Sequence, residues 1–598
     1  MQLVGALCIA WATLTAWLAL ARYGAVHNQT FDLALYARLA WGVAHGELSD
    51  PIGGGHFFGG HLSLVLLPLG LLGRVFGTVP VLLIAQSLCV ALAALPIAAL
   101  AMRRLGTPAG VVAAISFLFY PNLGHVTTYE FHPGNLAVLP LCYALDALDR
   151  QSPRALLWLC VAVVACRASL ALQTLMLGVL ALRSGAAMRR TGLRIALFSL
   201  AYFALFMWFS SPALHNTTPT SASLHFGKWG GSPFGVLTSL LRDPALVAQH
   251  FTAPARLLYP LLVLAPLACL ALLRPRLLLV ALPPLAQNLV SEFPTSIALY
   301  SHYLTPTVPA LVAASIEGLA WLRVRTGPKL AVRNLGLGAI AATAVTGSVV
   351  CGGLPWSRDF RRADFTHDQD SASALAVLTQ IDAHASVQVP DPLLPHLAER
   401  RVVHRAPPPE RATEYVVLDI SHRRRFARSE DLLRTVEEPD VRRWLGRTDH
   451  QLLLARGDLL LLRRGLPARA GLVRDYFVEG AAPTPGVALT ACLSVREARL
   501  RGTTLWLEFV AQGPCSEDLA IRLGADAKPT RVDLLFDGLL SPAQLKLGDV
   551  LRSRHTLSAK ERAAVLQHGL RIGVLRTSGA PPEPTDPVAI EVPLQIGR

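Results

Sequence analysis

The first 350 or so residues alternate long apolar stretches with short polar segments that are rich in arginine. A helix of roughly 20 apolar residues crosses the hydrocarbon core of a bilayer. Eleven stretches that approach this length predict membrane-spanning helices, at residues 3–20, 79–102, 107–120, 134–149, 154–166, 169–183, 193–211, 257–273, 276–291, 302–322 and 331–352. The apolar stretch 61–77 is shorter and contains Pro68 and Arg74, so we expect an interfacial or re-entrant helix there.

The pattern changes after residue 354. Between residues 366 and 465, helical runs such as ALAVLTQI alternate with short apolar runs such as YVVLD, which is typical of a small α/β domain. Beyond Pro467, alternating runs such as TTLWLEFVAQG and GLRIGVLRTSG predict a β-sandwich. We therefore expect an α-helical polytopic membrane bundle at 1–354, an α/β domain at 355–466 and a β-sandwich-like domain at 467–598.

Composition supports the membrane assignment. A mean hydropathy of +0.43 with 16% charged residues is too apolar for a soluble protein of 598 residues. The formal net charge of +15 is compatible with nucleic-acid binding, but no recognition motif accompanies the basic clusters, so we expect no nucleic-acid partner.

The basic clusters instead predict the topology. With residues 61–77 taken as non-spanning, they all fall on one side of the membrane, which the positive-inside rule makes cytoplasmic. The clusters contain Arg103, Arg104, Arg150, Arg154, Arg183, Arg189, Arg190, Arg194, Arg274, Arg276, Arg323, Arg325, Lys329 and Arg333. The amino terminus is then cytoplasmic, and eleven spans place the tail on the outer, periplasmic face of a bacterial inner membrane. In such an oxidising compartment Cys492 and Cys515, the two cysteines of the tail, could pair.

The predicted outer face carries the titratable residues of the front part. Ten histidines fall in predicted outer loops or at their edges: His27, His45, His56, His61, His125, His132, His215, His225, His250 and His302. In the first of these loops, near-helical spacing predicts a surface helix whose apolar positions are Phe31, Leu35, Leu39 and Val43. Thr30 is placed to cap this helix, and Asp32 lies in its first turn. Asp32 is therefore either a residue that the helix dipole favours or a general base at the membrane surface.

Two further outer-loop motifs supply candidate binding residues. Glu130 and His132 lie two positions apart, so in an extended chain both point the same way, as an acid/base pair or two metal ligands require. The alternative is that these residues anchor the loop at the membrane interface. His56 and His61 lie among glycines, which permit close approach of the backbone to a ligand.

The remaining candidates lie at or within apolar stretches. Arg167 interrupts the run AVVACRASLAL, where a charge is costly unless it is paired or hydrated. We interpret it either as a phosphate-binding residue or as half of a structural ion pair. His302 and Tyr303 begin a predicted span, where they either contact a ligand or belong to an interfacial aromatic belt.

Several motifs resemble a bacterial membrane family catalogued as domain of unknown function 2079. They are FDLALYARLAW (31–41), GGHLSLVLLPL (59–69), FLFYPNLGHVTTYEFHP (117–133), SHYLTPTVPAL (301–311), SVQVPDPLLPHLAERRVVHRAP (386–407) and YVVLDIS (415–421). The resemblance spans roughly residues 1–465, and the family in turn resembles the GT-C class of glycosyltransferases.

The GT-C resemblance implies a reaction. It implies that Asp32 is the catalytic base, that the donor is a polyprenyl-phosphate-linked sugar, and that membrane lipid and an unidentified acceptor are further partners. Cations must then stabilise the departing phosphate, for which the candidates are Arg38, Arg167, His61 and His302. No cofactor is established, a divalent metal stays open, and the metal ligands are unknown. The family commonly has an acidic pair where this chain has Cys166, Arg167, Ala168 and Ser169, a departure that bears on activity.

Two other functions are compatible with the sequence. Arg167 and the proline-broken spans favour a transporter, whereas the few intramembrane acids and the lack of a clear internal repeat count against one. A non-catalytic membrane assembly or sensing protein is the third alternative, and it would not depend on Asp32.

Overall fold

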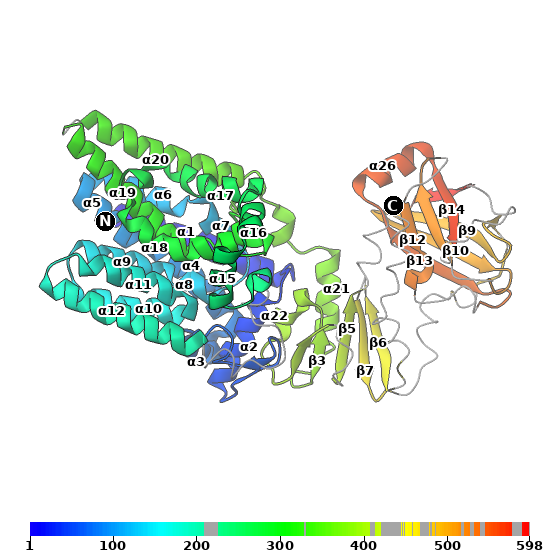
Figure 1. The fold of residues 1–598 in the computed structure, drawn as a ribbon. Coiled ribbons are helices and arrows are strands. Elements are labelled where there is room, and N and C mark those ends of the chain that lie inside the picture. The colour runs from blue at the N-terminus through cyan, green and yellow to red at the C-terminus, as the bar shows by residue number, and fades with distance from the viewer. Residues whose placement is uncertain are drawn as a thin grey trace. The chain divides into compact units, whose positions relative to one another are not determined.

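The computed structural model describes the chain except for residues 208–224, 328–329, 407–412, 420–443, 445–446, 448, 457–458, 467–477, 479–480, 485, 516–518, 527–530, 539–544, 577–588 and 597–598. The chain divides into two compact units (Figure 1). The first comprises Met1–Ser371 and Asp391–His404, and the second comprises Ala372–Pro390 and Arg405–Arg598. The segment Asp391–His404 thus belongs with the helical unit, although it follows the first strand of the second unit in sequence.

The first unit is a bundle of helices, drawn in blue to green in Figure 1. In chain order these are α1 (Gln2–Gly24), α2 (Asp32–Ala44), α3 (Leu66–Phe76), α4 (Thr78–Leu92), α5 (Ala94–Leu105), α6 (Thr107–Leu118), α7 (Pro121–Thr128), α8 (Pro133–Leu136), α9 (Val138–Asp149), α10 (Pro153–Cys166), α11 (Ala171–Leu182), α12 (Ala186–Leu205), α15 (Pro233–Arg242), α16 (Pro244–Phe251), α17 (Pro254–Leu264), α18 (Leu278–Val290), α19 (Val308–Arg325), α20 (Leu330–Cys351) and the short α22 (Leu394–Leu397).

Four helices among the described residues are long and apolar enough to cross a membrane. They are Gln2–Gly24, Thr78–Leu105, Thr305–Arg325 and Leu330–Cys351. A fifth is added if α6 and α7, which meet at a bend of 53°, form one span. Other apolar helices, such as α10 and α11, have the right composition but fall short of the bilayer thickness on their own. The bundle is therefore a multi-pass membrane fold, and the predicted count of eleven spans is not confirmed.

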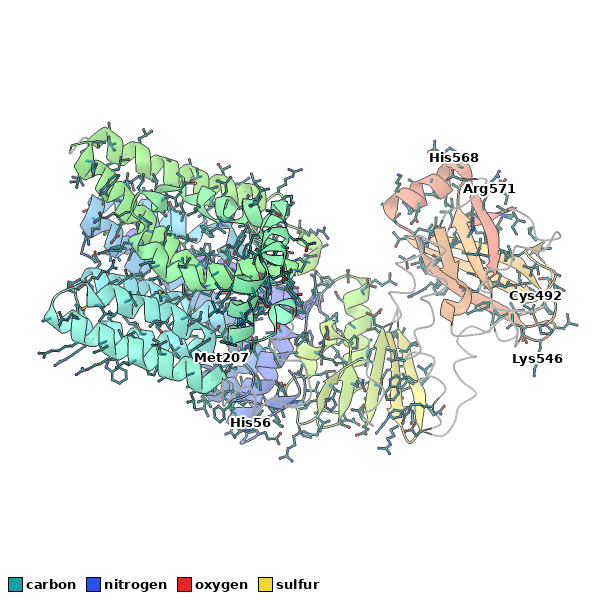
Figure 2. All side chains as sticks on the ribbon, in the orientation of Figure 1. His56, Met207, Cys492, Lys546, His568 and Arg571 are labelled. Atoms are coloured by element: carbon teal, nitrogen blue, oxygen red, sulfur yellow. A yellow bond between two sulfur atoms is a disulfide. The ribbon has the colours of Figure 1, made fainter. Side chains whose placement is uncertain are left out.

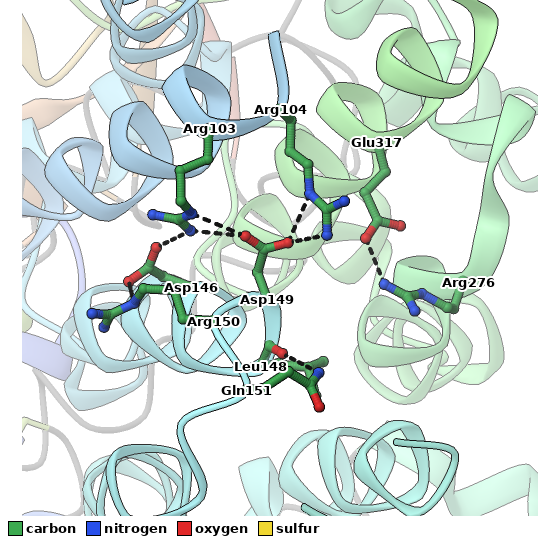
Figure 3. Close-up of polar contacts among 9 residues, drawn as sticks. All are labelled: Arg103, Arg104, Asp146, Leu148, Asp149, Arg150, Gln151, Arg276 and Glu317. Carbon is green, nitrogen blue, oxygen red and sulfur yellow. Dashed lines mark hydrogen bonds and ion pairs between the residues drawn. The ribbon is translucent and has the colours of Figure 1, made fainter. Parts of the chain in front are cut away.

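One end of the bundle is held by an ion-pair cluster (Figure 3). Arg103 and Arg104, in the last turn of α5, both pair with Asp149 at the end of α9, and Arg103 also pairs with Asp146 at 2.5 Å. Arginines are favoured at a helix C-terminus by the helix dipole. Arg103 and Arg104, which are among the residues that predict the topology, therefore also join the ends of α5 and α9.

The loop after α1 carries the residues of interest. It contains α2, a hairpin of β1 (Ser49–Asp50) and β2 (Gly55–His56), and then α3. Helix α3 packs closely on α2, because a Cβ at Gly70 would collide with the carbonyl of Ala40. This helix is the predicted non-spanning segment at 61–77, and it is eleven residues long.

The second unit contains an α/β part and a β-sandwich. In the first, a sheet of order β4-β3-β5-β7-β6 follows α21 (Gln369–Leu378). The first residues of α21 and of β4, 369–371 and 403–404, fall within the bounds of the first unit. Its strands are β3 (Val387–Val389), β4 (Val403–Arg405), β5 (Tyr415–Asp419), β6 (His450–Arg456) and β7 (Leu459–Arg464). Strands β3 and β5 pair in parallel, whereas β5, β7 and β6 are antiparallel.

The C-terminal part consists of two sheets that share one apolar core. One sheet has the order β13-β10-β9-β16 with β8 on β9, and the other has the order β12-β11-β14-β15. The strands are β8 (Val487–Ala488), β9 (Leu493–Arg501), β10 (Thr504–Ala511), β11 (Leu519–Gly524), β12 (Arg531–Leu534), β13 (Val550–Thr556), β14 (Leu570–Arg576), β15 (Ile590–Val592) and β16 (Leu594–Ile596), with helix α26 (Ala559–His568) before β14. A disulfide joins Cys492 to Cys515, and Figure 2 labels Cys492.

Candidate active site

The site is built around the N-terminus of α2, where Asp32 is the first helical residue. The first amides of a helix lack intrahelical acceptors. Here the acceptor is Glu130, which lies between α7 and α8 and is buried. Its carboxylate accepts the amide protons of Gln29 (3.0 Å), Thr30 (2.7 Å) and Leu33 (3.1 Å). A distant carboxylate therefore supplies the cap that the sequence assigns to Thr30.

Thr30 has a second role besides the predicted one. The N-cap position is Phe31, and the Thr30 hydroxyl accepts the amide proton of Asp32 in a long contact of 3.5 Å. The Thr30 hydroxyl lies 2.6 Å from Glu130 Oε2 and 3.1 Å from Asp32 Oδ2. It thus lies between the two carboxylates and can donate its single proton to either of them.

His132 faces Asp32 from the other side. The backbone at His132 is extended (φ −137°, ψ 127°), and its Nε2 lies 3.4 Å from Asp32 Oδ2. Glu130 and His132 therefore both point to the loop of Asp32, as their spacing predicts. Burial raises the pKa of Asp32, but the adjacent His132 and the Thr30 hydroxyl outweigh it and lower that pKa below its usual value. Asp32 is consequently ionised at neutral pH.

A stack of rings continues the site beyond His132. The rings of His132 and His302 lie parallel, with centroids 3.6 Å apart, and the His302 ring lies 4.0 Å from that of Tyr303. The hydroxyl of Tyr303 is 3.1 Å from Nε2 of His225. Burial, and then the charges of His132 and Arg167, lower the pKa of His302 well below its usual value. His302 is thus neutral at pH 7 and does not serve as a cation.

Arg167 lies at a break in the helical chain. It ends α10 with an extended backbone (φ −162°, ψ 131°), and α11 begins after the short 3₁₀ turn Ala168–Leu170. The carbonyl of His61 accepts the amide proton of Ala168 at 3.1 Å, which brings the glycine-rich His61 loop to this break. The Nε atom of Arg167 is buried without a hydrogen-bond partner among the described residues.

The charges of Arg167 and His61 act on residues of the site. Burial, and then the positive charge of Arg167, lowers the pKa of His225 to about 4, and the charge of Arg167 also acts on Tyr303. After His132 and Thr30, the charge of His61 also contributes to the lowered pKa of Asp32. The ring of His61 lies 6.4 Å from that of Tyr36 on α2. The structure therefore gathers Asp32, Glu130, His132, His302, Tyr303, His61 and Arg167 from five separate segments.

A residue that the sequence reasoning passed over holds this arrangement together. Gln86, fully buried in α4, accepts the amide proton of His132 at 2.9 Å and donates to the carbonyls of Val126 and Glu130. The sequence does mark Gln86, because it is an amide side chain inside an apolar span. Buried polar groups in membranes need partners and often mark functional sites.

Two predicted residues lie apart from this cluster. The guanidinium of Arg38 is fully buried on α2 and pairs with Glu47 at 3.2 Å. His56, labelled in Figure 2, is on the β1–β2 hairpin. Its Nδ1 accepts the amide proton of Phe58, and the two ring centroids are 5.5 Å apart. Neither residue belongs to the site around Asp32.

The described residues do not form a metal centre. Among them there is no group of three or more His, Cys, Asp or Glu side chains arranged to hold a metal ion. Glu130 is also already occupied by three amides and a hydroxyl, which leaves it little capacity as a metal ligand. We therefore derive no chemical step through a metal.

The fold and the site together define a multi-pass membrane protein with a polar site at the loop after its first helix. The chain belongs to the family described as predicted membrane protein (DUF2079), whose family model matches residues 22–449. No curated protein matches the sequence.

Two solved structures illustrate the matches found for this chain. ArnT from Cupriavidus metallidurans bound to undecaprenyl phosphate is 12% identical, with a TM-score of 0.40 over 76% of this chain and 98% of that one. The oligosaccharyltransferase of Archaeoglobus fulgidus in complex with Zn and sulfate is 12% identical, with a TM-score of 0.37 over 82% of this chain and 78% of that one.

Proposed function

We propose that this protein is an integral-membrane glycosyltransferase. It transfers a sugar from a polyprenyl-phosphate donor to an acceptor hydroxyl on the outer face of a bacterial inner membrane. The observation that carries the proposal is the ionised Asp32, which is held at the N-terminus of α2 between Thr30 and His132. The donor class comes from the resemblance of the sequence motifs to GT-C enzymes.

In this reaction Asp32 is the general base. Its ionised carboxylate takes the proton of the acceptor hydroxyl as that oxygen attacks the anomeric carbon, and His132 Nε2 lies 3.4 Å from the same carboxylate. The bond from the anomeric carbon to the phosphate oxygen breaks, and both electrons leave with the polyprenyl phosphate. Glu130 stays outside the chemistry, because its oxygens accept the hydrogen bonds that fix the base.

Arg167 is the cation that meets the departing phosphate. It has the properties that this role requires, since guanidinium groups bind phosphate oxygens in a bidentate way. Its Nε has no partner among the described residues. His302 has a lowered pKa and its ring stacks on that of His132, so it lines the site as a neutral ring rather than as a counter-charge.

The disulfide supports the outward orientation of the tail. Disulfides form and persist in oxidising compartments such as the bacterial periplasm, and are rare in the cytosol. A bond between Cys492 and Cys515 is therefore expected of an extracytoplasmic tail. The amino terminus and the arginine clusters then face the cytoplasm, as the positive-inside rule requires.

The test is sugar-transfer chemistry in the host membrane. Glycans and lipid-linked sugars are profiled in cells with the wild-type chain, a deletion, Asp32→Asn, and the matched control Asp359→Asn, which changes an exposed aspartate. We expect the deletion and Asp32→Asn to lack one glycan and to accumulate its polyprenyl-phosphate sugar, whereas Asp359→Asn behaves as the wild type. An unchanged profile in the deletion would instead favour a transporter or a non-catalytic protein.

A further inference from the structure

After the second unit has begun, the chain returns to the helical unit through the segment Asp391–His404, which we call the clamp segment. Its helix α22 packs against α2, and the two labels lie side by side in Figure 1. The chain after α20 therefore joins the helical unit at a second place, the clamp segment.

The clamp segment first holds α2, the helix that carries Asp32. The carbonyl of Arg401 accepts a hydrogen bond from Arg38 Nη2 at 3.2 Å, and the guanidinium of Arg401 pairs with Glu47 at 2.7 Å. Glu47 also pairs with Arg38. The Arg38 guanidinium is fully buried, and this small network supplies its counter-charge and the acceptors of Nη2, whereas Nε and Nη1 have no hydrogen-bond partner among the described residues. Arg38 lies about one and a half turns along α2 from Asp32.

The clamp segment also holds the start of α4. Glu399 Oε1 accepts the amide proton of Thr78, the first residue of α4, at 2.7 Å. A carboxylate at this position caps the helix and is favoured by its dipole. Helix α4 carries Gln86, which binds the chain at Glu130 and His132. The clamp segment thus contacts both α2, which carries the base, and α4, which holds the chain at Glu130 and His132.

Two further contacts fasten the same segment. The ring of His396 stacks on that of Tyr23 near the end of α1, with centroids 4.2 Å apart and planes 6° from parallel. Nδ1 of His404 lies 2.9 Å from the carbonyl of Pro51, in the loop between the two hairpin strands. The contacts therefore run from the end of α1 through the hairpin to α4.

We infer that the clamp segment is part of the catalytic apparatus, with Arg401 and Glu399 as positioning residues. It fixes α2 and α4 relative to each other, and through them the 3.4 Å contact between Asp32 and His132. The polypeptide that follows the last membrane helix would then be required for activity in the membrane. The catalytic part of this inference rests on the proposed function, whereas the positioning part does not.

The experiment uses the full-length chain in detergent and compares Glu399→Ala and Arg401→Ala with the wild type. Arg361→Ala is the matched control, because Arg361 is exposed and its side chain has no ion pair among the described residues. Hydrogen exchange is measured at the amides of Leu33 and His132, whose acceptors are Glu130 and Gln86. Sugar transfer is measured on the same preparations as kcat and KM.

We expect exchange at both amides to rise by about tenfold in the two clamp variants, and kcat to fall by about tenfold with little change in the donor KM. Arg361→Ala should match the wild type in both measurements. Unchanged exchange at both amides in Glu399→Ala and Arg401→Ala would overturn the inference. If the wild type shows no transfer while exchange responds as expected, the proposed function fails and the clamp stands.

Discussion

The carboxylate of Glu130 accepts the backbone amide proton of Leu33 at 3.1 Å, although the two residues are 97 positions apart. This bond caps the N-terminus of α2, the helix that carries Asp32, and orients its first turn. The first turn that carries the base is therefore held by a residue from the second loop, in addition to the contact between Asp32 and its neighbour Thr30.

Replacement of Glu130 should disturb the position of Asp32, although Glu130 itself does not take part in the chemical step. In Glu130→Ala three backbone amides lose their acceptor, and we expect kcat to fall by about 100-fold with a smaller change in KM. Glu130→Gln keeps one acceptor oxygen and should recover part of the rate. Equal losses in both variants would mean that the charge of Glu130, not its hydrogen bonds, matters.

The pH dependence of transfer should report the Asp32–His132 contact. Because the pKa of Asp32 is lowered, the carboxylate stays ionised as the pH falls, and we expect the rate to be level on the acid side down to about pH 5. Without the His132 side chain the pKa of Asp32 should rise, so the acid limb of His132→Ala should move to higher pH. The measurement is kcat against pH for both proteins, and an acid limb that does not move would contradict the pairing.

The tail should lose stability in acid through a buried pair in the β-sandwich. His555 Nδ1 lies 2.8 Å from Asp533, and burial is outweighed by His555 and Arg531, so the pKa of Asp533 is lowered. Its stabilisation is fully present above the unfolded value, near pH 4, and is lost as the pH falls through the folded value. Asp533→Asn should cost about 3 kcal/mol at pH 7. The difference in unfolding temperature between Asp533→Asn and the wild type should become smaller at acid pH.

The disulfide predicts both stability and compartment. The Cys492–Cys515 bond closes a loop with a sequence separation of 23, which corresponds to about 3 kcal/mol of stabilisation. We expect a reductant to lower the unfolding temperature of the tail, and Cys492→Ser to be insensitive to it. In intact cells, a membrane-impermeant thiol reagent should label the tail only after reduction. Labelling without reduction would contradict the pairing.

The ion pairs in Figure 3 should stabilise the bundle. A carboxylate that pairs with two arginines should contribute more than one that pairs with a single arginine. Asp149 bridges Arg103 and Arg104, whereas Glu317 pairs with Arg276 at 2.6 Å. Because the arginines are partly exposed, Asp149→Asn should cost about 1–2 kcal/mol and Glu317→Gln less than that. Unfolding of the purified protein in detergent measures both, and the difference should decrease at high salt.

Much of the local structure follows from the sequence. The apolar spacing after Phe31 predicts a helix, and α2 is found at Asp32–Ala44. The alternation in YVVLD predicts a strand, and β5 is found at Tyr415–Asp419. The spacing of Glu130 and His132 correctly indicates that both point to one place. These features depend on neighbours within a few residues, and periodicity reports such neighbours directly.

The tertiary structure alone decided which distant groups meet. The sequence marks His132, His302 and Arg167 as candidates, but their gathering beside Asp32 depends on how α8, α10 and α19 pack. The resemblance makes Arg38 one of the candidates to stabilise the departing phosphate, and the fold buries Arg38 against Glu47 and Arg401. The return of Asp391–His404 to the helical unit has no local signal either. Contacts between residues far apart in sequence depend on packing of the whole chain, so a pattern along one stretch determines the element but not its partner.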